Sequence, residues 1–119
     1  MPPLSPAVFH ILLSLADGER HGYGIKQEVA QRTGGRIDLG PGTLYGAIKR
    51  LLAQGVIEEA GQRPDPQLND ERRRYYRLTA RGQAVTRAEA ERLAELVRQA
   101  QAKRLLPGRH LEPSLGDAS

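Results

Sequence analysis

The apolar residues in the first third of the chain recur with the period of an α-helix. Ser5 and Pro6 form the favoured cap and first-turn pair of a helix, and apolar residues follow until residues 17–18, an Asp-Gly pair. A second helix is predicted from about residue 23 to residue 33, because apolar residues there lie one turn apart and two glycines at 34–35 end the pattern. The chain therefore begins with two short helices.

A third helix is predicted in the segment GPGTLYGAIKRLLAQG. Its apolar residues lie at positions i, i+4, i+7 and i+8, which form one stripe on a helix. They are Leu44, Ile48, Leu51 and Leu52. Gly55 closes the helix, and the face opposite the stripe carries no acidic residue. That face is polar and basic, so it is the first candidate for a functional surface.

Two short strands are predicted next, at 56–60 and 74–78, where residues with high β-propensity cluster. Alternation places Tyr76 and Leu78 on one face of the second strand, toward the core. Thirteen residues, 61–73, separate the strands. Hairpin loops usually have about two to five residues, so this segment is either flexible or functional, and part of it can extend the strands.

One long helical pattern runs from Thr79, a good cap residue, to about Leu106, a length of ~42 Å at 1.5 Å per residue. A core built from the preceding 80 residues cannot cover the whole apolar stripe of such a helix. We therefore expect a homodimer. The residues predicted at the dimer interface are Val85, Ala88, Leu93, Leu96, Val97 and Ala100.

The order of these elements predicts a mainly α fold with a small β-hairpin. Three helices followed by a two-stranded hairpin form a winged helix-turn-helix, in which the third helix enters the DNA major groove and the wing lies along the backbone or minor groove. We assign residues 1–78 to this domain, 79–106 to a C-terminal dimerisation helix and 107–119 to a flexible tail without an apolar period.

The charge of the chain is unevenly distributed. Its 119 residues suit one domain, and 18 Lys and Arg against 14 Asp and Glu give a net charge of +4. Five arginines and no acid lie between Arg72 and Arg81. A local cluster of this kind is typical of surfaces that bind nucleic acid, although arginine runs also occur as solvated loop ends.

Several classes of function are disfavoured by what the sequence lacks. Without cysteine there is no disulfide, thiolate metal site or cysteine nucleophile, and the three histidines have no metal-ligand spacing. No phosphate-binding glycine loop, nucleophile elbow or pair of catalytic carboxylates is present. We predict neither enzyme activity nor a cofactor or metal. The apolar runs are too short for a membrane helix and no signal peptide is recognisable, so we expect a soluble cytoplasmic protein.

The start of the third predicted helix offers groups that can hold a phosphate. Pro41 and Gly42 open this helix, where unpaired N–H groups and the positive dipole end favour an anion. Thr43 and Tyr45 add hydroxyl donors. We expect this end of the helix to position the protein on the DNA backbone.

Base contacts are expected about two turns further along the same helix, at Lys49 and Arg50. An arginine that donates two hydrogen bonds to guanine contributes about 1–3 kcal/mol of discrimination between bases. The sequence leaves open which of the two residues contacts a base and which contacts the flanking strand.

The predicted wing adds a second group of contacts. Three arginines at its second strand are expected to contact phosphates: Arg72, Arg73 and Arg74. Tyr75 either donates to a phosphate or packs under the wing, and Tyr23, in the second helix, either touches the DNA backbone or packs on the core. His21 and Gly22 are expected to shape the start of the second helix.

Three segments together resemble the PadR family of transcriptional regulators: HGYGI, GTLYGAIKRLLAQGVIE and RRRYYRLTARGQ. The resemblance covers about residues 4–106. It implies a dimeric winged-helix protein, usually a repressor, whose C-terminal helices form the dimer interface. A single C-terminal helix places this chain in the short subgroup. Family members commonly have a proline after GTLY, where this chain has Gly46, so groove contacts near Gly46 are expected to differ from those of relatives.

The favoured function is therefore a sequence-specific double-stranded DNA-binding transcriptional regulator, a repressor that acts as a homodimer on a roughly palindromic operator. The alternative is a winged-helix module that binds other proteins and has no specific operator. The resemblance also allows a small-molecule effector pocket at the dimer interface, for which Phe9, Leu93 and Val97 are candidate linings. With no Trp and one Phe, the chain lacks most of the aromatic walls that stack planar ligands.

Overall fold

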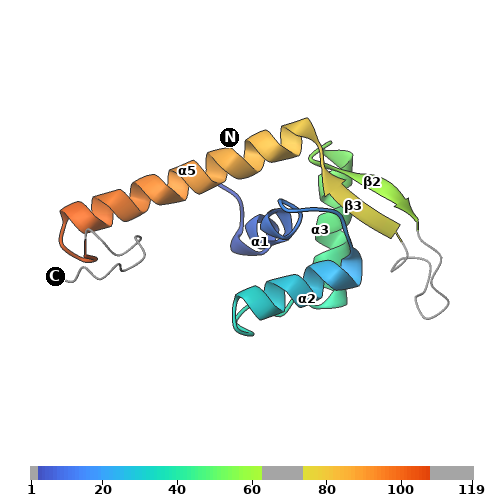
Figure 1. Ribbon diagram of the computed structural model, residues 1–119, viewed down its shortest axis with the longest axis horizontal. Coiled ribbons are helices and arrows are strands. Elements are labelled where there is room, and N and C mark those ends of the chain that lie inside the picture. Colours follow the sequence, from blue (N-terminus) through green and yellow to red (C-terminus); the bar gives the residue numbers. More distant parts are fainter. Residues whose placement is uncertain (1–2, 63–73, 108–119) are drawn as a thin grey trace. The chain divides into compact units, whose positions relative to one another are not determined.

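The computed structural model describes residues 3–62 and 74–107 and is mainly helical, with one small antiparallel sheet (Figure 1). Its elements follow the chain as α1 (Pro6–Ser14), β1 (Arg20–His21), α2 (Gly22–Arg32), α3 (Pro41–Ala53), β2 (Ile57–Gln62), β3 (Arg74–Leu78) and α5 (Ala80–Ala102). The predicted fold class, three helices, a β-hairpin and a long C-terminal helix, is confirmed.

The chain divides into two compact units, Met1–Arg87 and Ala88–Ser119. The first holds α1 to β3 and the opening turns of α5, and the second holds the rest of α5. We describe each unit by itself. The sequence-based boundaries at residues 78 and 106 stay predictions, and 108–119, most of the predicted tail, lie outside the described residues.

Polar side chains cap the starts of α1 and α2. The Ser5 hydroxyl accepts a hydrogen bond from the Val8 amide at 3.2 Å, at the start of α1. His21 Nδ1 accepts one from the Gly24 amide at 2.8 Å, and this caps α2. Each cap satisfies an N–H group that has no partner within its helix. The prediction that His21 shapes the start of α2 is confirmed.

Left-handed residues follow the ends of α2, α3 and α5. Gly34 and Gly55 have φ angles of 62° and 72°, and the backbone turns back on the last carbonyl groups of α2 and α3, as the glycine pattern predicted. The predicted extension of the last helix to Leu106 is wrong, because α5 ends at Ala102. Arg104 adopts φ 64°, and its amide and that of Leu105 bond to carbonyls of the last helical turn, each at 2.9 Å.

The sheet has three strands in the order β1-β3-β2, and both pairs are antiparallel. The sequence predicted only the β2–β3 hairpin. The added strand, β1, is two residues long and pairs Arg20 with Tyr76 and His21 with Tyr75. A register shift between Glu59 and Gly61 lets β2 run to residue 62, beyond its predicted end at residue 60. Residues 63–73 lie outside the described residues.

The core of the first unit is built where the apolar stripes of the helices meet the sheet. The largest fully buried side chains include Ile11, Leu12, Ile25, Leu44 and Ile57, which come from α1, α2, α3 and β2. Tyr76 of β3 is also buried, as the strand alternation predicted, and Leu78 packs against the cluster. Burial of these side chains holds α3 in a fixed orientation within the unit.

The first turn of α5 is fastened to the end of α3. The Thr79 hydroxyl donates to the Gly55 carbonyl at 2.6 Å and accepts from the Gly82 amide at 3.0 Å, so one side chain caps α5 and ties it to the preceding turn. A Cβ at position 82 would lie 1.9 Å from the Val56 carbonyl oxygen. Glycine is therefore required there. Within the described residues, no helix is both long and apolar enough to span a membrane.

Candidate nucleic-acid interface

Helix α3 has a buried and an exposed side. Leu44, Ala47, Ile48 and Leu51 are buried. Gly42, Gly46 and Lys49 follow one another at i, i+4 and i+7 on the opposite side, flanked by Thr43 and Arg50. We call these five residues the outer face of α3. The predicted separation of an apolar stripe from a basic face is confirmed.

The N-terminal end of α3 has no side-chain cap. Gly40 occupies the cap position in an extended conformation, Pro41 follows at the first helical position, and both are exposed. The Leu44 amide donates to the Gly40 carbonyl at 2.9 Å. The N–H groups before it lie where a helix end favours an anion.

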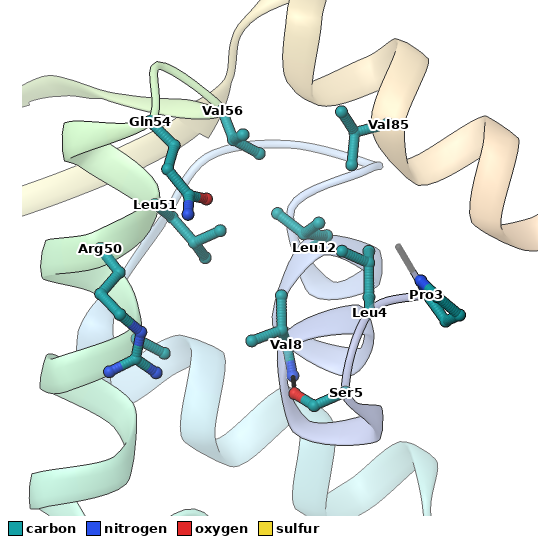
Figure 2. Close-up of a pocket in the computed structure, with 11 residues that line it drawn as sticks. Pro3, Leu4, Ser5, Val8, Leu12, Arg50, Leu51, Gln54, Val56 and Val85 are labelled. Atoms are coloured by element: carbon teal, nitrogen blue, oxygen red, sulfur yellow. Dashed lines mark hydrogen bonds between the residues drawn. The ribbon is translucent and has the colours of Figure 1, made fainter. Parts of the chain in front are cut away.

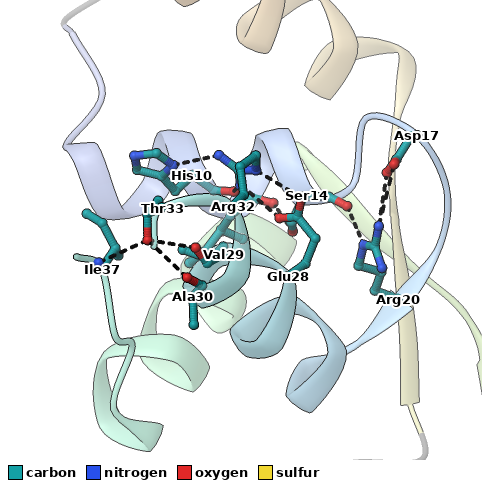
Figure 3. A network of polar contacts seen from close by, with 11 residues as sticks. His10, Ser14, Asp17, Arg20, Glu28, Val29, Ala30, Arg32, Thr33 and Ile37 are labelled. Atoms are coloured by element: carbon teal, nitrogen blue, oxygen red, sulfur yellow. Dashed lines mark hydrogen bonds and ion pairs between the residues drawn. The ribbon is translucent and has the colours of Figure 1, made fainter. Parts of the chain in front are cut away.

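A small polar framework holds the segment that leads into α3. The Thr33 hydroxyl donates to the Val29 carbonyl at 2.8 Å and accepts from the Ile37 amide at 3.1 Å (Figure 3). Lys26 donates to the Leu39 carbonyl at 3.1 Å and pairs with Asp38. These residues position the start of α3. Sequence reasoning did not single out the contacts of Lys26, since nothing local marks contacts between residues 12 or 13 apart.

The cations of the outer face differ from five of the eleven arginines in the described residues, which pair with acids. Within the described part of the chain, neither Lys49 nor Arg50 forms an ion pair or a side-chain hydrogen bond. Elsewhere arginines pair with acids: Arg20 with Asp17, Arg32 with Glu28, Arg77 with Glu58, Arg92 with Glu89 and Arg98 with Glu95. The outer face thus presents positive charge that nothing in the described chain neutralises.

Gly46 is partly exposed and has room for a Cβ. A Cβ built at this position would meet only a guanidinium nitrogen of Arg50, at 3.7 Å, which is an ordinary contact. Packing within the chain therefore does not require a glycine there. The missing side chain leaves a flat strip between Gly42 and Lys49 that another molecule can approach closely.

Tyr45 of α3 packs against Gly22 at the start of α2. It is half-buried, and a Cβ on Gly22 would lie 2.6 Å from its hydroxyl oxygen. The aromatic side chain thus fills the space that the glycine at the start of α2 leaves, and this close approach joins α2 to α3. Its contact with DNA stays a prediction, as does that of Tyr23, which lies on α2 with 37% of its surface exposed.

Of the three wing arginines predicted to contact phosphates, one lies in the described residues. Arg74 is exposed at the start of β3, while Arg72 and Arg73 lie outside the described residues. Tyr75 is half-buried with its ring edge-on to His21, the ring centroids 5.2 Å apart. Tyr75 thus packs against the side chain that caps α2.

Arg77 corrects the expectation of an unbroken basic cluster. Its guanidinium group donates to Glu58 of β2 at 2.8 Å and lies 3.7 Å from Glu19. The hydrogen bond to Glu58, with the charges of both glutamates, raises the pKa of Arg77 above its ordinary value. No acidic residue lies between Arg72 and Arg81 in the sequence, but the folded chain brings Glu58 and Glu19 next to Arg77.

Helices α1 and α2 are joined by a polar cluster of His10, Glu28 and Arg32, which we call the α1–α2 clamp (Figure 3). Arg32 donates two hydrogen bonds to Glu28, at 2.9 and 2.8 Å, one to the His10 carbonyl at 3.1 Å, and lies 2.9 Å from His10 Nδ1. Burial and the neighbouring Arg32 lower the pKa of His10. The hydrogen bond from Arg32 lowers the pKa of Glu28. In this clamp, Arg32 joins α1 to α2 and so stabilises the fold.

The second unit consists mainly of the C-terminal part of α5. Leu93, Leu96, Val97 and Ala100 recur at i, i+3, i+4 and i+7 along it, and Leu96 is 47% exposed. The exposed Ala88 also belongs to this unit, whereas Val85 packs against the core of the first unit. These positions stay predicted dimer contacts. Phe9, which is half-buried on α1, Leu93 and Val97 stay predicted effector contacts.

The known family that matches this chain is described as the transcriptional regulator PadR-like family, and the match covers residues 11–88. The chain belongs to this family. The resemblance seen in the sequence is therefore confirmed, and so is the prediction that the chain is not an enzyme, because the family is one of transcriptional regulators.

Two curated relatives show how far the similarity reaches. The transcriptional regulator Rv3488 of Mycobacterium tuberculosis is 38% identical over 90 residues, which cover 76% of this chain and 78% of that protein. An uncharacterized 37.1 kDa protein in transposon TN4556 of Streptomyces fradiae is 41% identical over 89 residues. The match covers 72% of this chain but only 22% of that longer protein.

Solved structures agree on the fold. A transcriptional regulator from Clostridium thermocellum has a TM-score of 0.66 at 28% identity, with 81% of this chain and 89% of that chain covered. Bacillus subtilis PadR, solved in complex with operator DNA, has a TM-score of 0.60 at 21% identity, with 75% of this chain and 47% of that chain covered. This PadR-like chain thus has the winged-helix fold of DNA-binding transcription regulators.

Proposed function

We propose that this PadR-like regulator is a repressor that binds a specific double-stranded operator as a homodimer, with the outer face of α3 in the major groove. The observation that carries the proposal is the outer face itself. It combines an uncapped helix start, a glycine that packing within the described chain does not require, and two cations without acid partners in the described chain.

Each part of the outer face suits a different part of a duplex. The start of α3, with Gly42 and the Thr43 hydroxyl, supplies donors for a phosphate group and fixes the position of the helix on the backbone. Lys49 and Arg50, about two turns further, supply donors for base edges or for the phosphates of the facing strand. Gly46 lies between these groups and allows a close approach.

In the proposal, the wing and Tyr23 of α2 also contact the DNA backbone. We assign a phosphate contact to Arg74, which is exposed at the start of β3, and the same role to Arg72 and Arg73. Because Tyr75 packs against the His21 cap, we give it a positioning role in the wing rather than a primary contact. Bacillus subtilis PadR, which shares the fold, is in complex with operator DNA.

A homodimer accounts for the apolar residues of the second unit. A lone helix with Leu93, Leu96, Val97 and Ala100 along one side is not stable in water unless that side is covered. The same helix of a second copy is a self-complementary cover. Two α3 helices related by a two-fold axis would then bind half-sites about one helical turn apart, ~34 Å, on a pseudo-palindromic operator.

We propose repression because occupation of an operator that overlaps a promoter blocks transcription. We also propose a cytoplasmic location, where a DNA-binding regulator meets its operator. The direct test is selection of bound fragments from the source genome at moderate salt, followed by a transcription assay on the selected promoter. We expect fragments that share one inverted repeat, with half-sites about ten base pairs apart, and lower transcription when the protein is added. Recovery of unrelated fragments without a common repeat would contradict a specific operator. It would favour a protein–protein interaction module.

The dimer has its own test. Sedimentation equilibrium at micromolar concentration should return twice the 13.1 kDa mass of the chain. Leu96→Glu, which places a charge in the stripe, should shift the population toward monomer, whereas the exposed Arg98→Glu should have little effect. A native chain that sediments only as a monomer would contradict this part of the proposal.

A further inference from the structure

An acidic side chain lies near the start of α3, at the end of the helix that the proposed function assigns to a DNA phosphate. Asp38 stands two residues before Gly40, which occupies the cap position, and 74% of its side chain is exposed. Two residues of chain span at most about 7 Å between Cα atoms. An acid at this place weakens the attraction that the helix end offers to an anion.

Lys26 of α2 is paired with this acid. Its ammonium group donates to the Asp38 carboxylate and, at 3.1 Å, to the carbonyl of Leu39, which directly precedes Gly40. A residue from the middle of α2 thus reaches the backbone that leads into α3. The ammonium charge lies at the same end of α3 as the carboxylate and offsets it.

The position of Lys26 along α2 points to the same surface. Lys26 follows Tyr23 by three residues, so the two side chains lie on one side of the helix. Tyr23 is the α2 residue to which the proposed function assigns a contact with the DNA backbone. A lysine one turn from it and beside the start of α3 suits a phosphate contact. In the described structure, Asp38 holds this lysine instead.

The ion pair adds little to the stability of the fold. Its side chains are 32% and 74% exposed, and water and salt screen pairs of this kind. The segment before α3 has other supports, because Leu39 is buried and the Thr33 hydroxyl bonds to Val29 and Ile37. The effect of Asp38 is therefore expected in DNA binding rather than in unfolding.

We propose that Asp38 limits the affinity of this protein for DNA of any sequence. It does so by holding Lys26 in an internal ion pair and by repelling a phosphate at the start of α3. Such a limit matters to a regulator, because unrelated genomic sites far outnumber operators and compete for the protein through phosphate contacts. This role rests on the proposed function, since the start of α3 has to face the duplex.

Fluorescence anisotropy with a labelled duplex of unrelated sequence tests this role without a known operator. Asp38→Asn should bind about three- to fivefold more tightly than the native chain at about 50 mM salt, and the gain should nearly vanish at about 200 mM, since one added phosphate contact steepens the salt slope by about 0.9. Its unfolding temperature should stay unchanged. A merely structural role would shift unfolding and leave the salt slope as it is.

Asp17→Asn is the matched control. Asp17 pairs with Arg20, and the exposed fractions of this acid and its cation, 73% and 31%, almost equal those of Asp38 and Lys26. Figure 3 shows Asp17 at the opposite end of the polar network from Ile37, the neighbour of Asp38. Both substitutions raise the net charge by one. DNA affinity of Asp17→Asn should change by less than about 1.5-fold, because salt screens charges that are far from the phosphates.

A double-mutant cycle separates the two effects of Asp38. Lys26→Gln keeps an amide donor for the Leu39 carbonyl but carries no charge. In this background Asp38→Asn removes only the repulsion, so the gain in affinity should fall below about twofold. An equal gain with and without Lys26 would overturn the hold on Lys26. An equal effect of Asp38→Asn and Asp17→Asn in the native background would overturn the role of Asp38 altogether.

Lys49→Gln distinguishes a failure of this role from a failure of the proposed function. Lys49 is exposed and, unlike Arg50, does not line the cavity of about 180 Å³ between α1, α3 and the first turns of α5 (Figure 2). Its substitution should weaken duplex binding about threefold at about 50 mM salt. That loss without a gain in Asp38→Asn would overturn the role of Asp38 and leave the outer face in place. A native protein that binds no duplex would contradict the proposed function and this role together.

Discussion

Arg32 and Arg50 occupy opposite kinds of surface in the same unit. In the α1–α2 clamp, Arg32 donates to the Glu28 carboxylate and the His10 carbonyl, so its charge is used within the fold. On the outer face of α3, Arg50 has no ion pair or side-chain hydrogen bond in the described chain, and Gly46, one turn before it, has room for a Cβ. The number of cations in a sequence therefore says less about a DNA-binding surface than whether acidic side chains pair with those cations in the fold.

The largest effect is expected on DNA affinity. Arg50→Gln should weaken binding to the selected operator by about 1–3 kcal/mol, roughly 5- to 150-fold, with much less loss on unrelated DNA and little change in stability. Arg98→Gln on α5 is the matched control, because it removes the same charge from an exposed ion pair. Its affinity should stay within about twofold. Equal losses for both variants in fluorescence anisotropy would show that net charge, rather than the outer face, sets affinity.

The next effect is on stability. Arg32→Gln removes charge-assisted hydrogen bonds that join α1 to α2, and it should lower the free energy of unfolding by about 1–2 kcal/mol, a figure reduced because the arginine is partly exposed. Urea denaturation of this variant beside Arg98→Gln measures the difference. Operator affinity of the folded Arg32→Gln protein should be unchanged. If that affinity fell as far as in Arg50→Gln, the distinction between the two surfaces would be lost.

Gly46→Ala should act in two directions. Alanine is favoured over glycine inside a helix by about 1 kcal/mol, and the new methyl group meets no backbone, so the free energy of unfolding should rise by up to that amount. The same methyl group would stand between the outer face and a duplex, so operator affinity should fall. Thermal unfolding and anisotropy on one preparation measure both. A stabilised variant that binds DNA as well as the native chain would place the contact elsewhere.

The smallest effect is expected on the free energy of unfolding when the pH is lowered. The pKa values of Glu28 and His10 both lie below their ordinary values, so the folded state binds fewer protons than the unfolded state as pH falls through the ordinary values of 6.5 and then 4.5. Stability is therefore fully present above pH 6.5 and declines toward pH 4. Urea titrations over this range should show a shallower decline in Arg32→Gln, because the variant removes the hydrogen bond that lowers the pKa of Glu28 and the charge that, after burial, lowers the pKa of His10. An equally steep decline would mean that other carboxylates dominate.

Local signals were enough for most of the fold. Helix starts at Ser5 and Thr79, the glycine ends at Gly34 and Gly55, and the apolar stripe of α3 all depend on residues within a few positions of each other. The end of α5 was misplaced because Arg104 takes a left-handed conformation that is uncommon for a residue other than glycine.

Contacts between distant residues explain the other differences. Strand β1 has two residues and no pattern, so only its pairing with β3 reveals it. The outer face of α3 followed from helical spacing, whereas the neutralisation of Arg77 by Glu58, 19 residues away, did not. The clamp joins His10 to Arg32 across 22 residues. The cavity beside Arg50 depends on α1, α3 and α5 meeting, which no single segment specifies.

An NMR titration of the labelled protein with the selected operator duplex tests most directly whether the outer face of α3 contacts DNA. We expect the largest chemical-shift changes at Thr43, Gly46, Lys49 and Arg50, and little change at His10 and Arg32 of the α1–α2 clamp. Shift changes concentrated on the clamp, with the outer face of α3 unaffected, would contradict the proposed DNA contact.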